Sequence, residues 1–196
     1  MVRAHLVYLH GLHSSPESKK AQTVMAFVRS WRPEVAIHVP QLHYDPDKNW
    51  DTLQPLMSDL RQGQNTVALI GSSMGGYYAA CLGQHYVLRT ALVNPVIDPQ
   101  KLLSRCRDEF VHEKTGERYR FTEADAAKFV RWGTVSESAC RNTLLCLGLR
   151  DEVLSPQWAL ERLGTCRRII DPSGDHYFSR FSTILPEVMV FLLPVS

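Results

Sequence analysis

Short apolar runs alternate along the chain with longer stretches whose apolar residues recur every three to four positions. The short runs are rich in branched side chains, which is typical of buried strands. They lie at residues 5–9, 35–39, 66–70, 90–93, 143–148 and 168–171. The longer stretches predict helices at about 17–31, 50–61, 77–82, 122–130, from 156 onward and at 179–193. This alternation predicts an α/β protein with a mostly parallel six-stranded sheet and helices on both faces.

One segment, residues 104–132, interrupts the alternation. It is dense in charges of both signs, and residues 115–119 within it predict a turn. We expect this segment to be an insertion that lies above the sheet as a small cap, inside a single domain that spans residues 1–196. A solvated connection without a role is the alternative interpretation.

Composition narrows the class of protein. The 196 residues carry a net charge of +2, with 44% hydrophobic and 21% charged residues, as in ordinary soluble globular domains. So small a charge does not favour a nucleic-acid or membrane partner. No stretch has the length of a membrane span, and the first apolar run is too short for the core of a signal peptide. The five cysteines are odd in number and lack Cys-x-x-Cys spacing, so we expect reduced thiols and a cytoplasmic protein.

The strongest chemical signal is Gly71-Ser72-Ser73-Met74-Gly75, between a predicted strand and a predicted helix. Gly-x-Ser-x-Gly in that setting is typical of a nucleophile elbow. The small residues two before and two after the serine permit a turn tight enough to lift its hydroxyl out of the sheet. The pattern favours Ser73 as a nucleophile, and a glycine-rich turn without chemistry is the alternative.

A serine hydroxyl needs a base to take its proton and an acid to orient that base. Both belong in loops after strands and downstream of the elbow, because the site of an open α/β sheet lies at the carboxyl ends of its strands. His176 follows the last strand and is the predicted base. Asp151 directly follows the fifth strand and is the predicted acid, with Asp98 as the rival location. Asp171 and Asp175 are weaker candidates for the acid.

The loop after the first strand predicts the rest of the site. An oxyanion needs two N–H donors, and we expect these from Met74 and from Leu12. Gly11 would let the backbone approach a substrate, and His10 would brace the loop. His10 and His13 have no third ligand at a known metal-site spacing, so we expect no metal.

Side chains near these loops are expected to contact the substrate. Besides His10 and Gly11, the predicted substrate-binding residues are Tyr77 and Tyr177. The glycines of the elbow match neither a phosphate-binding loop nor a dinucleotide fingerprint, and we expect no cofactor.

With these residues in place, the chain resembles the α/β-hydrolase superfamily and, more narrowly, the small bacterial esterases of the YqiA type. The resemblance runs nearly end to end. It rests on Tyr8-Leu9-His10-Gly11, Ser14-Ser15-Pro16, Pro40-Gln41-Leu42, Gly71 to Ala79, Val93-Asn94-Pro95, Thr115-Gly116, Asp151 to Leu154 and Gly174 to Phe178. It implies a lightly capped hydrolase that lacks the first two strands of the full fold and has the sheet order 2-1-3-4-5-6. One departure is Arg150, where the family favours a small residue, and it could either contact Asp151 or compete with His176.

The predicted reaction is acyl transfer in two steps. Ser73 attacks the carbonyl of a small-molecule ester or thioester, and water then releases the acyl group. The resemblance implies an esterase for short acyl groups, with acyl-CoA thioesters as a further substrate class. A dedicated thioesterase, a carbon–carbon bond hydrolase and a non-catalytic interaction protein of the same fold are alternatives. The natural substrate and the oligomeric state do not follow from the sequence.

Overall fold

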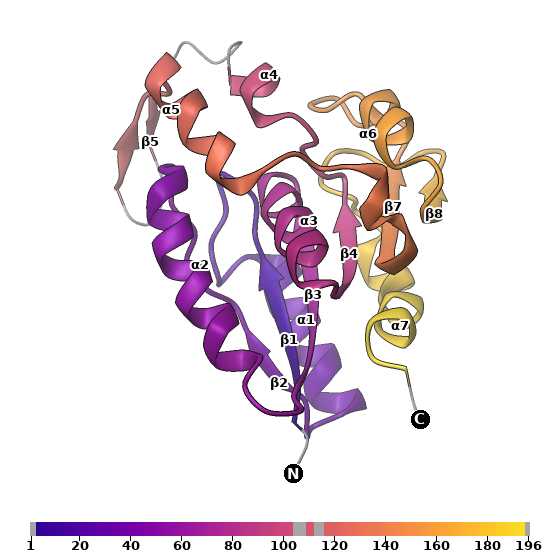
Figure 1. Cartoon of the computed structure of the whole chain (residues 1–196). Helices are drawn as coiled ribbons and strands as arrows, with labels where there is room; N and C mark the ends of the chain where they lie inside the picture. Colours follow the sequence, from indigo (N-terminus) through magenta and orange to yellow (C-terminus); the bar gives the residue numbers. More distant parts are fainter. Residues whose placement is uncertain (1–2, 104–108, 112–115, 195–196) are drawn as a thin grey trace.

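A six-stranded parallel sheet forms the centre of the computed structural model, which describes residues 3–103, 109–111 and 116–194 (Figure 1). Its strands are β1 (Ala4–Leu9), β2 (Ala36–His38), β3 (Thr66–Ser72), β4 (Arg89–Val93), β7 (Thr143–Gly148) and β8 (Arg167–Asp171). The spatial order is β2-β1-β3-β4-β7-β8, with every neighbouring pair parallel. Counted along this sheet alone, the order is 2-1-3-4-5-6, which confirms the prediction.

Two hydrophobic layers sandwich the sheet, because successive strand residues point to opposite faces. Leu6 and Tyr8 of β1 pack with α1 (Lys19–Trp31) and α7 (Phe181–Leu192) on one face. Val7 and Leu9 pack with the other layer, to which α2 (Pro46–Leu60), α3 (Met74–Tyr86) and α6 (Pro156–Leu163) belong. Burial on both faces explains why these strands are continuous apolar runs rather than alternating ones.

Capping side chains or an N-terminal proline mark the starts of three helices, α1, α2 and α6. Ser18 caps α1 by accepting a hydrogen bond from the Ala21 amide. The helix α2 begins four residues earlier than predicted, since Asp45 caps it and Pro46 occupies the first position, where a missing N–H costs nothing. Pro156 has the same place in α6, as predicted.

The segment after β4 carries its own small elements. These are α4 (Pro99–Leu103), β5 (Phe110–Val111), β6 (Arg118–Tyr119), α5 (Glu123–Lys128) and the 3₁₀ helices η1 (Phe129–Trp132) and η2 (Glu137–Asn142). The predicted short helix is confirmed as α5, with Thr122 as its N-cap. The predicted turn is wrong at Arg118 and Tyr119, which pair antiparallel with β5, while residues 112–115 lie outside the described ranges. Figure 1 shows α4, β5 and α5 beyond the carboxyl ends of β1 and β4, and the role of this segment as a cap stays a prediction.

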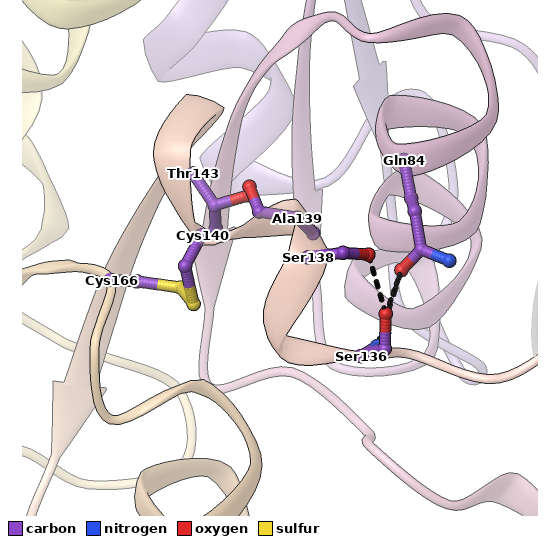
Figure 2. The surroundings of a disulfide bond; sticks show 7 residues. All are labelled: Gln84, Ser136, Ser138, Ala139, Cys140, Thr143 and Cys166. Carbon is purple, nitrogen blue, oxygen red and sulfur yellow. Dashed lines mark hydrogen bonds between the residues drawn. A yellow bond between two sulfur atoms is a disulfide. The ribbon is translucent and has the colours of Figure 1, made fainter.

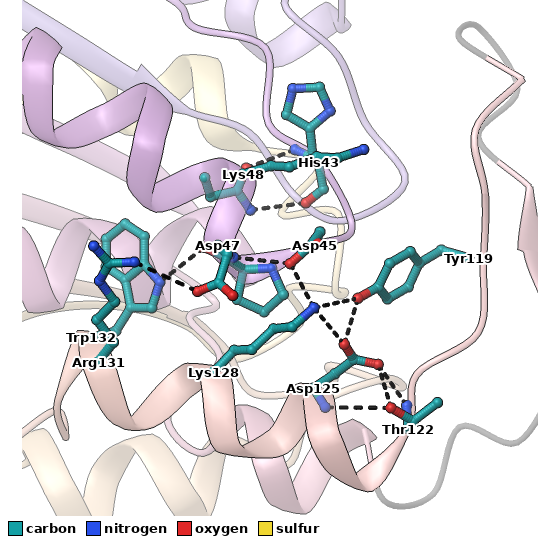
Figure 3. A network of polar contacts seen from close by, with 12 residues as sticks. His43, Asp45, Asp47, Lys48, Tyr119, Thr122, Asp125, Lys128, Arg131 and Trp132 are labelled. Carbon is teal, nitrogen blue, oxygen red and sulfur yellow. Dashed lines mark hydrogen bonds and ion pairs between the residues drawn. The ribbon is translucent and has the colours of Figure 1, made fainter.

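Ion pairs fasten this segment to the start of α2 (Figure 3). The Lys128 ammonium contacts Asp45 at 3.0 Å and Asp125 at 2.9 Å. Although burial opposes it, hydrogen bonds from Lys128, Tyr119 and Thr122 hold the pKa of the Asp125 carboxyl below its usual range. This network could not be predicted from the sequence because its members are up to 83 residues apart.

One disulfide joins Cys140 in η2 to Cys166, just before β8 (Figure 2). The prediction of reduced thiols is therefore wrong for this pair. The two residues meet because η2 leads into β7 and Cys166 leads into β8, and these strands are neighbours in the sheet. Cys81 and Cys146 are buried free thiols, and Cys106 lies outside the described residues.

Among the described residues, no helix combines the length and the apolar character needed to cross a membrane. The cytoplasmic location stays a prediction, and the disulfide removes the cysteine argument for it.

Candidate active site

The turn between β3 and α3 holds Ser73 in an unusual backbone conformation. Its φ is 55° and its ψ is −121°, a region that costs a residue with a side chain of order 1–3 kcal/mol. Backbone hydrogen bonds fix it there: the Ser73 N–H donates to Val93 at 3.0 Å, and its carbonyl accepts from Gly76 at 2.9 Å, from Val96 at 3.0 Å and from Tyr77 at 3.4 Å. The turn thus presents the serine hydroxyl beyond the end of the sheet.

Glycine is required on both sides of this serine. A Cβ at Gly71 would collide with the backbone of Gly75, and one at Gly75 would collide with the carbonyl oxygens of Leu9 and His10. The prediction that the small residues permit a close backbone approach is therefore confirmed.

The structure brings the three predicted catalytic side chains together from three loops. His176 Nε2 lies 3.2 Å from Ser73 Oγ, and His176 Nδ1 lies 2.8 Å from Asp151 Oδ2 and 3.0 Å from Oδ1. Because a carboxylate can only accept, Nδ1 carries the ring proton and Nε2 presents its lone pair to the serine hydroxyl. This is the tautomer that a general base needs.

Backbone hydrogen bonds hold the Asp151 carboxylate in place independently of its contact with His176. Its side chain is 2% exposed, and Oδ1 accepts from the amides of Val153 at 2.9 Å and Leu154 at 2.7 Å. Arg150 is exposed and, within the described part of the chain, forms no ion pair with Asp151. The rival acids are engaged elsewhere, since Asp98 caps α4 at the Lys101 amide, Asp171 binds Ser173 and Asp175 binds Ser179.

Asn94 is a bracing residue that the sequence reasoning did not assign. Its side-chain amide donates to the carbonyls of Asp175 at 2.8 Å and His176 at 3.0 Å, and its Oδ1 accepts from the Gly148 amide at 2.8 Å. Its φ of 41° suits asparagine, which tolerates the left-handed region. Asn94 therefore ties the ends of β4 and β7 to the histidine loop. An Asn-Pro pair directly after a strand was the available signal.

The two predicted oxyanion donors border the serine. β1 pairs with β3, so the loop after β1 lies against the elbow, and a Cβ on Gly11 would be 3.3 Å from Ser73 Cβ. Leu12 and Met74 both line the pocket described below. The Met74 amide is at the first position of α3, where the helix leaves its N–H groups without intrahelical acceptors.

Two predicted substrate contacts lie elsewhere. Tyr77 is 1% exposed, and its hydroxyl donates to the Gly133 carbonyl at 2.8 Å, so it anchors the segment before η2 rather than contacting the pocket. His10 is 1% exposed, and its Nε2 accepts from the Leu42 amide while its Nδ1 donates to the Gly11 carbonyl. These contacts agree with the prediction that His10 braces the loop. The expectation that Tyr77 and His10 contact substrate is corrected accordingly.

A cavity of about 410 Å³ opens at Ser73 and His176, and its walls are mostly apolar. Gly11 and Tyr177, two of the predicted substrate-binding residues, line it, and their contact with a substrate stays a prediction. The other lining residues are Tyr8, Leu12, His13, Ser14, Ser18, Lys20, Ser72, Met74, Leu102, Leu103, Phe110, Val153 and Leu154. The segment after β4 thus contributes Leu102, Leu103 and Phe110 to this pocket.

Lys20 is a pocket residue that the sequence reasoning missed. It is buried on the same face of α1 as Val24 and Val28. The spacing 20, 24, 28 is that of one helix face, so a lysine on the apolar stripe was the signal.

Within the described ranges, no cluster of three or more His, Cys, Asp or Glu side chains is arranged to hold a metal ion.

Comparison with known proteins agrees with this architecture. The model of an uncharacterised protein family, UPF0227, matches residues 5–193. Est1E from Butyrivibrio proteoclasticus, in a structure with ferulic acid bound, is similar with a TM-score of 0.71 and 14% identity over 98% of this chain and 89% of that one. A putative hydrolase from Agrobacterium vitis gives 0.68 and 21% over 97% and 88%. A pyrethroid hydrolase from Sphingobium faniae gives 0.59 and 17% over 99% of each chain. At these identities the likeness establishes the α/β-hydrolase fold.

Proposed function

The chain belongs to the uncharacterised family UPF0227, and we propose that it is a serine esterase that cleaves small esters through an acyl-enzyme. One observation carries the proposal: Ser73, His176 and Asp151 form an unbroken hydrogen-bonded series in the wall of an apolar pocket. The fold alone would not carry it, because one fold hosts many functions.

The first half-reaction forms the acyl-enzyme. His176 Nε2 takes the proton of the Ser73 hydroxyl while Oγ attacks the ester carbonyl, and Asp151 stabilises the imidazolium that results. The negative charge on the carbonyl oxygen is received by the amides of Leu12 and Met74, where one such donor is worth about 3 kcal/mol. His176 then passes the proton to the departing alcohol.

The second half-reaction repeats these roles with water. His176 takes a proton from water, the hydroxide attacks the acyl carbonyl, and Ser73 leaves with the proton returned by His176. Neither half requires a cofactor, since each proton that leaves one oxygen is delivered to another.

The size of the pocket supports a short acyl group. A cavity of about 410 Å³ with apolar walls is at the small end of ligand sites. Neighbours of this fold include a structure with ferulic acid bound and a pyrethroid hydrolase, which agrees with ester chemistry. The same steps would cleave a thioester, so parallel rates on a nitrophenyl ester and on the matching acyl-CoA decide between these two substrate classes.

The direct test replaces the nucleophile. Ser73→Ala should lower kcat on 4-nitrophenyl butyrate by about 10⁴-fold or more, since removing a triad nucleophile leaves only the catalysis of the oxyanion site and binding. Ser58→Ala, an exposed serine on α2, is the matched control and should keep wild-type turnover. Wild-type turnover in Ser73→Ala would refute the proposal.

A further inference from the structure

Lys20 places a cationic side chain inside the reaction pocket. It is the second residue of α1 and is 9% exposed. Its ammonium donates to Ser72 Oγ at 3.1 Å and lies 4.4 Å from the centre of the Tyr177 ring. Ser72 immediately precedes the proposed nucleophile, and Tyr177 immediately follows the proposed base. The charge therefore lies beside the reacting groups.

The fold does not explain this charge. Burial disfavours an ammonium, and so does the first turn of a helix, where the dipole is positive. Within the described residues, no carboxylate forms an ion pair with Lys20. Asp151 and Asp175 act on it only from a distance, and their oxygens already accept from other groups. A neutral side chain would fill the same space without these costs.

The ammonium keeps capacity for a further partner. A protonated lysine has three N–H donors. One is used by Ser72, and the ammonium lies over the ring of Tyr177, which supplies no lone-pair acceptor at that distance. Burial lowers the pKa of Lys20 to about 8, so the side chain is still mainly charged at neutral pH. In a pocket that is otherwise mostly apolar, such a donor strongly favours one anionic group.

The geometry points to an anion subsite at Lys20, bordered by Ser72 and Tyr177. This subsite would bind a carboxylate group that the ester substrate carries. This inference rests on the proposed esterase for its reaction and specifies the substrate class: a small ester that bears one free carboxylate. The carboxylate could belong to the acyl part, as in a half-ester of a dicarboxylic acid, or to the alcohol part. Both sources present the same group to Lys20.

Two pairs of substrates separate the sources. For the acyl side, 4-nitrophenyl hydrogen glutarate is compared with 4-nitrophenyl 5-methylhexanoate, its uncharged shape match. For the alcohol side, 3-carboxy-4-nitrophenyl butyrate is compared with 4-nitrophenyl butyrate. The quantity measured is the ratio of kcat/KM for the charged ester to that for the neutral one. Each ratio is referred to the wild type, which cancels the intrinsic reactivity of the esters.

The variants are Lys20→Met, which keeps the length and removes the charge, and Lys19→Met, which makes the same change at an exposed neighbour. We expect Lys20→Met to lower the ratio at least tenfold in one pair, and the pair affected identifies the source. Lys19→Met should leave both ratios within twofold of wild type. A Lys20→Met ratio unchanged in both pairs, whatever the loss of overall rate, would overturn the inference.

A binding measurement keeps this test independent of catalysis. Calorimetry of the same four esters with Ser73→Ala and with Ser73→Ala/Lys20→Met should show at least tenfold weaker binding of one charged ester in the double variant. Equal affinities for that ester would contradict the subsite even if the esterase proposal held. If the wild type turned over none of the esters, the proposed function would fail while the binding result still decided the subsite.

The pH profile of the ratio adds a readout that a structural lysine would not affect. Ser72 and Tyr177 contact Lys20, the carboxylates of Asp151 and Asp175 act on it electrostatically, and His176 and Tyr8 line the same pocket. The wild-type ratio should fall between pH 7 and pH 9.5, as Lys20 loses its proton around its pKa of about 8. A flat ratio over this range would also count against the subsite.

Discussion

The two walls of the pocket are built in different ways. The wall with Ser73, Asp151 and His176 consists of loops at the ends of strands, and hydrogen bonds hold each loop. The Val93 carbonyl accepts from the Ser73 N–H, the amides of Val153 and Leu154 donate to the Asp151 carboxylate, and the Asn94 side chain donates to the His176 carbonyl. The wall from the segment after β4 is held by ring packing and by ion pairs to α2. Hydrogen bonds restrict both the distance and the angle between their partners, whereas ring contacts and partly exposed ion pairs restrict them less. We therefore expect the first wall to control kcat and the second to control KM.

After replacement of Ser73 itself, the largest expected effect is that of Asp151→Asn. An asparagine can still accept from Val153 and Leu154, so the fold should persist, but its amide group cannot accept the His176 proton as a carboxylate does. The histidine would lose its productive tautomer, and kcat on 4-nitrophenyl butyrate should fall by about 10³–10⁴-fold.

Asp98→Asn is the matched control, because Asp98 occupies the rival position and only caps α4. It should keep kcat within threefold of wild type. Equal losses in the two variants would show that the loop after β7 does not supply the acid.

A smaller loss is expected when the histidine loop loses its brace. Asn94→Gly suits the φ of 41° but removes three side-chain hydrogen bonds, two of them to the carbonyls of Asp175 and His176. We expect kcat to fall by about 10–100-fold with little change in KM, since a misplaced base costs that much. Val87→Gly, an exposed residue with a φ of 56°, controls for the backbone change. A raised KM with kcat intact would assign Asn94 to substrate binding instead.

On the second wall, Asp125→Asn should lower the free energy of unfolding at pH 7 by about 1–2 kcal/mol, because it breaks a hydrogen-bonded ion pair with a partly exposed partner. Since the folded pKa of Asp125 is depressed, its contribution is fully present above the ordinary carboxyl value of about 3.9 and is lost as the pH falls through the folded pKa. The difference in the free energy of unfolding between wild type and variant, measured by urea denaturation, should therefore be smaller at pH 3 than at pH 7.

Asp51→Asn, at an exposed position of α2, serves as the control and should show no such difference at either pH. If Asp125→Asn lowered the free energy of unfolding as much at pH 3 as at pH 7, packing and uncharged hydrogen bonds, rather than the ion pair, would account for the stability of the segment.

The smallest effect is expected at Phe110, whose ring lies 4.9 Å from that of His13 at the edge of the pocket. Phe110→Ala should raise KM for 4-nitrophenyl butyrate by about threefold to tenfold, which corresponds to part of one aromatic contact, and leave kcat within twofold. Val111→Ala, at the exposed neighbour, should change neither constant. A fall in kcat with KM unchanged would contradict the claim that the second wall controls KM and the first wall controls kcat.

The positions of the residues in the first wall could be predicted from the sequence because local rules determine them. Strand alternation gave the sheet, the glycines around Ser73 gave the elbow, and loops after parallel strands gave Asp151 and His176. The disulfide, the β5–β6 pair and the ion pairs of Lys128 escaped because they depend on which distant segments meet.

The errors at single residues have the same origin. Tyr77 is one turn past the elbow, and only packing against the segment before η2 directs its hydroxyl away from the pocket. Lys20 was overlooked because a charged residue on an amphipathic helix is ordinarily assigned to its exposed face.

The central claim is that Ser73 is a nucleophile activated by His176. The most direct measurement is labelling of the wild type with a fluorophosphonate, followed by mass spectrometry of its peptides. We predict one adduct per chain on Ser73, and at least 100-fold slower labelling in His176→Ala. An unlabelled protein, or an adduct on any other residue, would contradict the account.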